Sequence, residues 1–419
     1  MFRVLCIEFV NLKALSFTML TENEEIVLVT GGSGFIGQHI IHLLSCDMFK
    51  LGIKEIRSLD LEPYKNTTNP ERECAAIRSF IGDIRKPETL LDAFRGVDTV
   101  FHCAGLISLQ YPPNYAELDG HNVDGTRAVV ELCVQENIKR LIYTSCASVC
   151  MVPFKGHSTF AMVINQTESK ATTPKYDAQN PNNFDGRFLI TGYSSSKLRA
   201  ETIVLNSNGA LLYNQKGYLT TTAIRPPLTY GEGDQHFLPK ILTYLRQRDY
   251  TYPRIAGAGG KQQIAYAGNV AWGHICAYKT LKTSAKNIAG LPVFITDDTP
   301  INDISRFIQK IGLASGKYTA QRTAWYLPHF LFFFMATLIE LFIKFLAPVK
   351  KIKLEYSLRA ISSFTASVMM FNRLRAAIHM DYVPLVEADV AIERTGKWVS
   401  KWLEKNHSIK MKETFKKHC

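Results

Sequence analysis

A glycine-rich stretch near the N-terminus constrains the fold of this chain more than any other feature. Ile26–Gly37 reads I-V-L-V-T-G-G-S-G-F-I-G, a short apolar run rich in β-branched residues that opens directly into four glycines. This order predicts a buried parallel strand, a tight turn and the N-terminus of an amphipathic helix. The unpaired backbone N–H groups and the dipole of such a helix suit a pyrophosphate. We therefore expect a dinucleotide cofactor that carries nicotinamide.

Asp60 closes the next apolar run, Ile56–Asp60, where a carboxylate can hydrogen-bond the ribose of an adenine nucleotide. Because Leu59 and Leu61 supply no cation for a 2′-phosphate, Asp60 favours NAD over NADP. On these grounds, the residues expected to bind the cofactor are Gly31, Gly34, Phe35, Ile36, Gly37 and Asp60.

Composition excludes several other classes of protein. The 419 residues are 46% hydrophobic and 21% charged, as in a globular chain. Much of the net charge of +12 lies late in the sequence beside an apolar segment, and the first half has no basic stripe with interleaved aromatic residues, so we expect no nucleic acid partner. The nine cysteines form no C-x-x-C pair, which predicts a reducing compartment and no metal site.

Apolar runs typical of strands alternate with amphipathic stretches typical of helices. The expected strands are Ile26–Thr30, Ile56–Asp60, Phe80–Arg85, Val97–Phe101, Arg140–Thr144 and Leu219–Arg225, and the expected helices are Pro87–Phe94, Asn114–Asn137 and Tyr193–Val204. This alternation indicates βαβ units. The sequence predicts an α/β fold, a doubly wound parallel sheet (Rossmann) with a smaller C-terminal substrate lobe and a membrane-associated helical segment.

Changes in composition and hydrophobic periodicity along the sequence predict how the chain is divided. From Met151 to Phe188 the periodicity disappears, and so long a structureless loop is expected only where it covers a site. We expect an N-terminal extension at 1–23, an NAD-binding Rossmann domain at 24–225, a substrate-side lobe at 226–324, a membrane-associated hydrophobic segment at 325–350, the C-terminal part of the substrate lobe at 351–405 and a basic tail at 406–419.

The segment Trp325–Pro348 is the most apolar part of the chain. Only Glu340 and Lys344 interrupt its centre, and their spacing lets them pair on one helical face. The segment is long enough to span a bilayer, and Trp325 and Tyr326 before it and lysines after it are typical of interfacial anchors. We expect a membrane lipid surface as a partner. Spanning the bilayer and lying in its interface both stay open, and the alternative is a buried core helix.

A second motif, Tyr193-Ser194-Ser195-Ser196-Lys197, carries the chemistry. Tyr193 and Lys197 share one face of the predicted helix. An ammonium beside a phenol favours the phenolate and lowers the pKa of the phenol, which makes Tyr193 a better base at neutral pH. The same lysine can hydrogen-bond a cofactor ribose, so Lys197 has two expected roles.

These motifs together resemble the extended short-chain dehydrogenase/reductases, and within them the 3β-hydroxysteroid dehydrogenase/isomerase family. The matching segments are Thr30–Gly37, Gly82–Arg85, Asn122–Thr126, Tyr193–Lys197, Arg225–Asp234, Gly268–Trp272 and Pro384–Ala388. The hydrophobic segment after the catalytic part also resembles the membrane segment of that family. The resemblance covers about residues 24–405.

The resemblance implies NAD-dependent oxidation of a 3β-hydroxyl on a steroid or sterol-like substrate, with coupled double-bond isomerisation left open. It implies that Tyr193 takes the hydroxyl proton while hydride passes to the nicotinamide, and that Lys197 holds the ribose. Asn122 serves the catalytic helix or a proton relay, or is a buried structural amide. Further cofactor contacts implied by the resemblance are Asp83, Ile84, Ala104 and Pro226.

Cys146 departs from the family pattern, because it stands where the family usually has a catalytic serine. A thiol is a weaker hydrogen-bond donor than a hydroxyl. Three alternatives follow: Ser145 or another hydroxyl substitutes, Cys146 suffices at a reduced rate, or substrate handling differs. The catalytic candidates are therefore Tyr193, Lys197, Cys146, Ser145 and Asn122.

Two other functions compete with this one. The first is a related enzyme acting on a 4-carboxysterol or a sugar nucleotide, although a sugar-nucleotide enzyme has no need of the apolar segment. The second is a non-catalytic NAD-binding sensor or membrane scaffold, against which Tyr193 and Lys197 argue. We expect a cytosol-facing protein of the endoplasmic reticulum membrane, with a mitochondrial membrane as the alternative and a homodimer left open.

Overall fold

The computed structural model describes residues 24–46, 51–68, 77–156, 158–176, 184–255 and 260–418, with side chains up to residue 406. The expected N-terminal extension at 1–23 lies outside the described residues.

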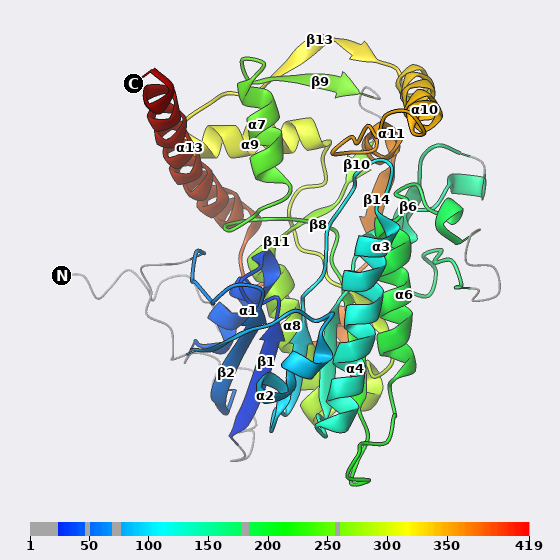
Figure 1. Cartoon of the computed structure of the whole chain (residues 1–419), viewed down its shortest axis with the longest axis vertical. Coiled ribbons are helices and arrows are strands. Elements are labelled where there is room, and N and C mark those ends of the chain that lie inside the picture. Colours follow the sequence, from blue (N-terminus) through cyan, green and yellow to red (C-terminus); the bar gives the residue numbers. More distant parts are fainter. Residues whose placement is uncertain are drawn as a thin grey trace.

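A seven-stranded parallel sheet fills the lower half of the molecule in Figure 1. Across the sheet the strands are β12 (Pro292–Phe294), β7 (Thr220–Arg225), β5 (Arg140–Thr144), β4 (Thr99–His102), β1 (Glu25–Thr30), β2 (Ile53–Asp60) and β3 (Ile77–Ile81). The chain builds outward from β1 to β3 and then from β4 to β12, so the order reverses between β1 and β4. This is the predicted doubly wound arrangement, and ligands bind at such a reversal.

Helices cover both faces of the sheet. One face carries α1 (Phe35–Leu44) and α8 (Ala267–Thr283), which pack on each other and share a core with the sheet. The opposite face carries α2 (Leu91–Phe94), α4 (Gly125–Gln135) and α6 (Tyr193–Asn206) over a second core.

The strand β1 shows why its sequence is continuously apolar. Val27 and Val29 lie in the first core and Leu28 lies in the second, and all three are fully buried. Successive side chains of a strand point to opposite faces, so a strand that is covered on both sides needs apolar residues at every position.

Two predicted elements differ in extent. The helix expected at Pro87–Phe94 is a 3₁₀ turn, Pro87–Thr89, followed by α2. The helix expected at Asn114–Asn137 is α3 (Tyr115–Leu118), a π-helical segment (Asp119–Asp124) and α4. The strand expected at Phe80–Arg85 lies earlier, in β3.

A smaller lobe lies above the sheet in Figure 1. Its elements are β8 (Leu228–Tyr230), α7 (Leu238–Arg246), β9 (Thr251–Ile255), β11 (Ile264–Tyr266), α9 (Ile304–Ser315), β13 (Gln321–Leu327) and α13 (Ala388–His418). α9 and α13 pack together, and β9 pairs with β13. The expected basic tail continues α13.

The expected boundary at residue 225 divides elements of one sheet. β12 pairs with β7 and α8 packs on α1, although both β12 and α8 come from the range expected to form the lobe, 226–324. The chain leaves the sheet after β7 and returns to it through α8, so contiguous ranges cannot describe the two parts. The division into a Rossmann part and a substrate lobe stays a proposal, with β12 and α8 now assigned to the Rossmann part.

The expected structureless loop at 151–188 contains a strand. β6 (Met162–Gln166) joins β14 (Val368–Phe371) and β10 (Lys261–Gln262) in a three-stranded sheet. α11 (Leu358–Ala366) and α12 (Leu374–Met380) flank β14. Local periodicity missed β6 because its partner strand is distant in the sequence.

The apolar segment forms α10 (His329–Leu346), the one helix among the described residues that is long and apolar enough to cross a membrane. Only Ala336, Glu340 and Ile343 of α10 are buried. The expected pair of Glu340 with Lys344 does not form. Glu340 instead accepts hydrogen bonds from Ser357 Oγ (2.8 Å) and Arg359 Nε (2.6 Å), because it lies on the stripe that faces α11.

Candidate active site

The glycine-rich turn lies between β1 and α1 at the carboxyl end of the sheet. Gly34 is the N-cap of α1, no side chain caps the helix, and its first turn has no acidic residue. The first N–H groups of a helix have no intrahelical partner, so those of Phe35 and Ile36 suit an anion. A Cβ at Gly37 would lie 2.1 Å from the Gly31 carbonyl oxygen, so the close approach of helix and turn requires glycine. This cradle fits the diphosphate of NAD.

Asp60 ends β2 beside this turn, as predicted. Its Oδ2 accepts a hydrogen bond from the Ser33 N–H at 2.8 Å, and its Oδ1 accepts one from the Leu61 N–H at 2.7 Å. These two bonds fix a half-buried carboxylate next to the glycine turn.

The next predicted pair, Asp83 and Ile84, follows β3. Asp83 forms an ion pair with Arg85 at 2.5 Å, and hydrogen bonding from Arg85 lowers the pKa of Asp83. Ile84 is 6% exposed and belongs to the core beneath α4. In this arrangement the Asp83 carboxylate is held by Arg85, two residues further along the chain.

Ala104 and Asn122 belong to the segments after β4. The Ala104 N–H donates to Thr30 Oγ1 at 3.4 Å, which brings Ala104 to the glycine turn. Asn122 Oδ1 accepts from the Leu106 N–H at 2.7 Å, and Asn122 Nδ2 donates to the Leu106 carbonyl oxygen at 3.1 Å and to Ser196 Oγ at 3.0 Å. Asn122 thus ties the segment after β4 to α6.

Lys197 lies one turn into α6 and is buried. Its Nζ donates to the Thr144 carbonyl oxygen at 2.7 Å and lies 4.3 Å from the centre of the Tyr143 ring. Burial lowers the pKa of Lys197 to about 8, and the nearby Cys146 and Cys103 thiols act in the opposite direction.

Tyr193 differs from expectation in its ionisation. Burial raises the pKa of Tyr193 well above its ordinary value, and the neighbouring Cys146 and Tyr143 raise it further. The expected lowering by Lys197 is wrong for this arrangement, because the ammonium turns to the Thr144 carbonyl and desolvation of the phenolate dominates. Here the phenol keeps its proton at neutral pH.

Cys146 and Ser145 are oriented differently. The Cys146 thiol is half-exposed and lies beside Tyr193. Ser145 is 3% exposed and donates to Glu201 Oε2 at 2.6 Å, on the far side of the strand end. The structure therefore brings Cys146 to the tyrosine and holds the Ser145 hydroxyl on Glu201, so of the three alternatives it does not favour substitution by Ser145.

Sequence reasoning missed a buried ion pair behind the site. Arg225 Nε donates to Glu201 Oε2 at 2.8 Å, and Arg225 Nη2 donates to Glu201 Oε1. Pro226 follows Arg225, and its carbonyl oxygen accepts from the Ala147 N–H at 2.9 Å. The pair and this bond join α6 to the ends of β5 and β7. The sequence feature that could have indicated this ion pair is Glu201, two helical turns beyond Tyr193.

The structure thus gathers most predicted residues at the carboxyl ends of β1, β2, β4 and β5. They are Gly31, Gly34, Phe35, Ile36, Gly37, Asp60, Ala104, Asn122, Cys146, Tyr193 and Lys197. Among the described residues, no cluster of three or more histidine, cysteine or acidic side chains could hold a metal ion.

An apolar cluster adjoins Tyr193 on the side of the lobe. It includes Leu109, Met151, Leu189, Phe364 and Phe371, from segments that are far apart in the sequence. Met151 and Phe371 are 1% and 5% exposed, so this cluster is packed core next to the tyrosine.

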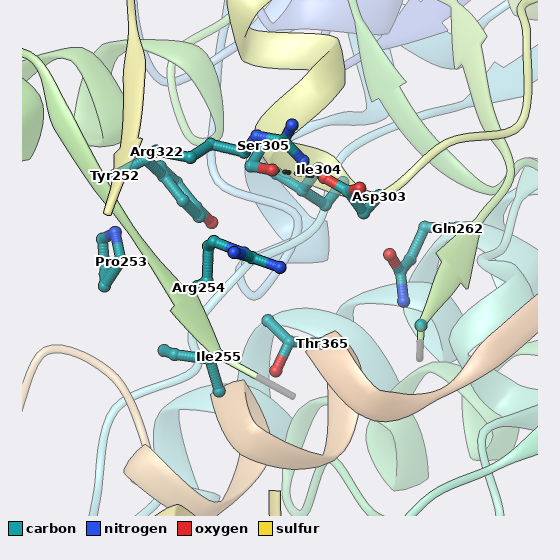
Figure 2. Close-up of a pocket in the computed structure, with 11 residues that line it drawn as sticks. Tyr252, Pro253, Arg254, Ile255, Gln262, Asp303, Ile304, Ser305, Arg322 and Thr365 are labelled. Carbon is teal, nitrogen blue, oxygen red and sulfur yellow. Dashed lines mark hydrogen bonds between the residues drawn. The ribbon is translucent and has the colours of Figure 1, made fainter. Parts of the chain in front are cut away.

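A separate hollow in the lobe has a different character. Figure 2 shows Arg254, Arg322, Asp303, Ser305 and Thr365 around it, at the start of α9 and beside β9. The Asp303 carboxylate already accepts a hydrogen bond from the Ser305 hydroxyl. None of the predicted site residues lines this hollow, whose walls combine charged residues with Tyr252, Ile255 and Ile304.

Comparison with known proteins identifies similar sequences. Residues 28–328 match the 3-beta hydroxysteroid dehydrogenase/isomerase family. The chain is 30% identical over 329 residues to short-chain dehydrogenase/reductase family 42E member 1 of Xenopus laevis, covering 78% of this chain and 76% of that protein. It is 27% identical over 392 residues to 3beta-hydroxysteroid-dehydrogenase/decarboxylase isoform 2 of Arabidopsis thaliana, covering 90% of this chain and 62% of that protein.

Solved structures confirm the fold. UDP-glucose 4-epimerase from Bifidobacterium longum, in complex with NAD+ and UDP, superposes with a TM-score of 0.62 at 16% identity, covering 90% of this chain and 98% of that one. MoeE5 in complex with UDP-glucuronic acid and NAD gives a TM-score of 0.60 at 16% identity, covering 90% of this chain and 99% of that one.

The family match covers most of the chain. The chain therefore belongs to the 3-beta hydroxysteroid dehydrogenase/isomerase family, a branch of the extended short-chain dehydrogenase/reductases whose members are NAD-dependent oxidoreductases that act on CH–OH groups.

Proposed function

We propose that this protein oxidises a 3β-hydroxyl group on a steroid or sterol-like substrate, with NAD as the hydride acceptor. The observation that carries the proposal is the juxtaposition of Tyr193, Lys197 and Cys146 at the carboxyl end of the sheet, next to an apolar cluster. The substrate class is supported by family membership and by the Arabidopsis thaliana relative, of whose length the chain spans 62%.

NAD supplies the nicotinamide carbon that accepts the hydride. Its diphosphate would lie at the N-terminus of α1, and its adenosine ribose at Asp60. Lys197 Nζ, which gives one N–H to Thr144, has two further donors for the nicotinamide ribose. Tyr193 must first release its own phenolic proton; its phenolate oxygen would then receive the hydroxyl proton, and the Cys146 thiol would hydrogen-bond the substrate oxygen.

The Arabidopsis thaliana relative suggests a variant of this reaction in which a 4-carboxysterol is oxidised and then loses carbon dioxide. The same residues would serve its oxidation step. Release of carbon dioxide from a 4-carboxysterol distinguishes the two proposals. A non-catalytic NAD-binding protein remains the competing class and predicts no turnover on any member of a sterol panel.

We propose further that α10 attaches the protein to a membrane. Its outward side chains are large and apolar, with Phe330, Phe334, Phe342 and Phe345 between 60% and 79% exposed. Trp325 and Tyr326 precede it and are also exposed, and lysines follow it, as in a segment that lies at an anionic lipid surface.

An in-plane position suits α10 better than a crossing. Its inner stripe holds Glu340, which is 1% exposed and bonded to Ser357 and Arg359, and Tyr111 Oη donates to the Glu340 carbonyl oxygen at 3.2 Å. A helix crossing the bilayer would carry these partners into hydrocarbon, which is costly. The endoplasmic reticulum is the proposed membrane. Fractionation of the full chain against a chain lacking α10 tests the attachment, and light scattering tests whether the protein is a homodimer.

The catalytic proposal is tested by NAD reduction with detergent-purified protein and a panel of 3β-hydroxysteroids, sterols and 4-carboxysterols. Turnover by the wild type and its loss in Tyr193→Phe are expected. If the protein binds NAD but oxidises none of these substrates, the catalytic proposal fails and only an NAD-binding function is left.

A further inference from the structure

We infer that Asp185 is a positioning residue that fixes the start of α6 and so the direction of Tyr193. The inference rests on the proposed role of Tyr193 as the group that exchanges the substrate proton. Asp185 lies in a 3₁₀ turn, Asp185–Arg187, at the end of the long segment that precedes α6.

The backbone before Tyr193 is strained. Gly192 has φ 75° and ψ −69°, and the Tyr193 N–H donates to the Thr191 carbonyl oxygen at 2.9 Å. These features define a γ-turn with positive φ, which is rare. A Cβ at Gly192 would lie 2.9 Å from Pro113 Cβ and 3.0 Å from Leu118 Cδ1, so both the conformation and the space require glycine.

The Asp185 carboxylate holds this turn from outside the helix. Its Oδ1 accepts from the Gly192 N–H at 2.6 Å and from Ser195 Oγ at 2.5 Å, and its Oδ2 accepts from Tyr115 Oη at 2.8 Å. Gly192 has no side chain with which to cap α6. Asp185 instead binds the backbone N–H of the N-cap residue and a first-turn side chain, and its negative charge lies at the favourable end of the helix dipole.

Strained turns of this kind persist only where their surroundings hold them, and they cluster at active sites. Tyr193 is the first residue of α6, so it moves first if the turn relaxes. Lys197 lies one turn further on, and its bond to the Thr144 carbonyl does not depend on Asp185. Loss of Asp185 should therefore impair the chemical step more than the binding of the cofactor.

The test compares Asp185→Ala and Asp185→Asn with Arg187→Ala in the same turn. Arg187 is exposed and, among the described residues, hydrogen-bonds only to the Lys175 carbonyl oxygen, so Arg187→Ala controls for disturbance of the segment. The measurements are kcat and KM for the sterol substrate, the Kd of NADH by fluorescence, and Tm.

For Asp185→Ala we expect kcat to fall by roughly 10- to 100-fold, in line with the cost of misplacing a reacting group by about 1 Å. The Kd of NADH should change less than about threefold, because the bond of Lys197 to the Thr144 carbonyl does not depend on Asp185. Asp185→Asn should recover most of the activity, because its amide oxygen can accept from the Gly192 N–H. Arg187→Ala should match the wild type.

An unchanged kcat in Asp185→Ala overturns the inference, and so does a loss of kcat that the Kd of NADH follows in proportion. If Asp185→Ala does not fold, the double variant Ser195→Ala/Tyr115→Phe removes two of the three hydrogen bonds to Asp185. It should lower kcat without altering the Kd of NADH. An unchanged kcat in this double variant would also overturn the inference. Tyr193→Phe separates the two claims. If it retains turnover, the proposed function fails; if it is inactive while the Asp185 variants turn over normally, only the positioning role fails.

Discussion

Replacing Glu201 with alanine should destabilise the protein strongly, because it leaves the buried guanidinium of Arg225 without its carboxylate partner. The side chains of Glu201 and Arg225 are 2% and 4% exposed, and Glu201 accepts two bonds from Arg225 and one from Ser145. Removing one partner of a buried ion pair costs about 3–5 kcal/mol. The lost bond to Ser145 adds about 1 kcal/mol. We therefore expect a loss of roughly 4–6 kcal/mol in the free energy of unfolding.

At about 2.1 cal/mol/K of unfolding entropy per residue, 1 kcal/mol corresponds to about 1 °C in Tm for this chain, so Glu201→Ala should melt at least about 4 °C lower. The assay is denaturant and thermal unfolding in detergent. Glu201→Met/Arg225→Met should recover most of the loss, because no charge is left buried. Glu393→Ala removes an exposed partner of Lys397 and serves as the control that should not change Tm. A loss below about 1 kcal/mol in Glu201→Ala would refute the reasoning.

Four further predictions concern the cofactor, the thiol, pH and the membrane. Asp60→Ala should narrow the preference for NAD over NADP in paired titrations, and a wild type that binds NADP as tightly as NAD would contradict the role of Asp60. Cys146→Ser should raise kcat, because a hydroxyl is the better donor to developing charge, where a good donor is worth up to ~2–4 kcal/mol; a slower Cys146→Ser enzyme would show that the thiol has its own role. Because the pKa of Lys197 is about 8, its ammonium is lost as pH rises through that value, so the affinity for NAD should weaken between pH 7 and 9 in the wild type and stay flat in Lys197→Met. Phe334→Glu/Phe342→Glu should move the protein from membranes to the soluble fraction, whereas Tyr213→Glu, at an even more exposed aromatic residue near the end of α4, should not.

Much of the fold could be predicted because its signals are local. The β1 strand is covered on both faces and therefore reads as an unbroken apolar run, and the glycine turn that follows must admit the first turn of α1. The same locality placed Tyr193 and Lys197 on one helical face. The path of the chain between the sheet and the lobe was missed, because β12 pairs with β7 only after the chain has passed through the lobe, and β6 pairs with the distant strand β14.

The errors at the site arose from contacts between distant segments. Whether Lys197 lowers the pKa of Tyr193 depends on where its ammonium points, and the Thr144 carbonyl that holds it comes from β5. Ser145 and Cys146 are adjacent in the sequence, yet only the contact of Ser145 with Glu201 shows which of them faces the tyrosine. Asp185 gave no sequence signal, since its partners lie on two other elements.

Isotope transfer tests the central claim most directly. A 3β-hydroxysterol carrying deuterium at C3 is incubated with NAD and either the wild type or Tyr193→Phe, and the reduced cofactor is examined by mass spectrometry. The proposed function predicts deuterium in the NADH formed by the wild type, a 3-keto product, and neither in Tyr193→Phe. NADH without deuterium, or labelled NADH formed equally well by Tyr193→Phe, would contradict it.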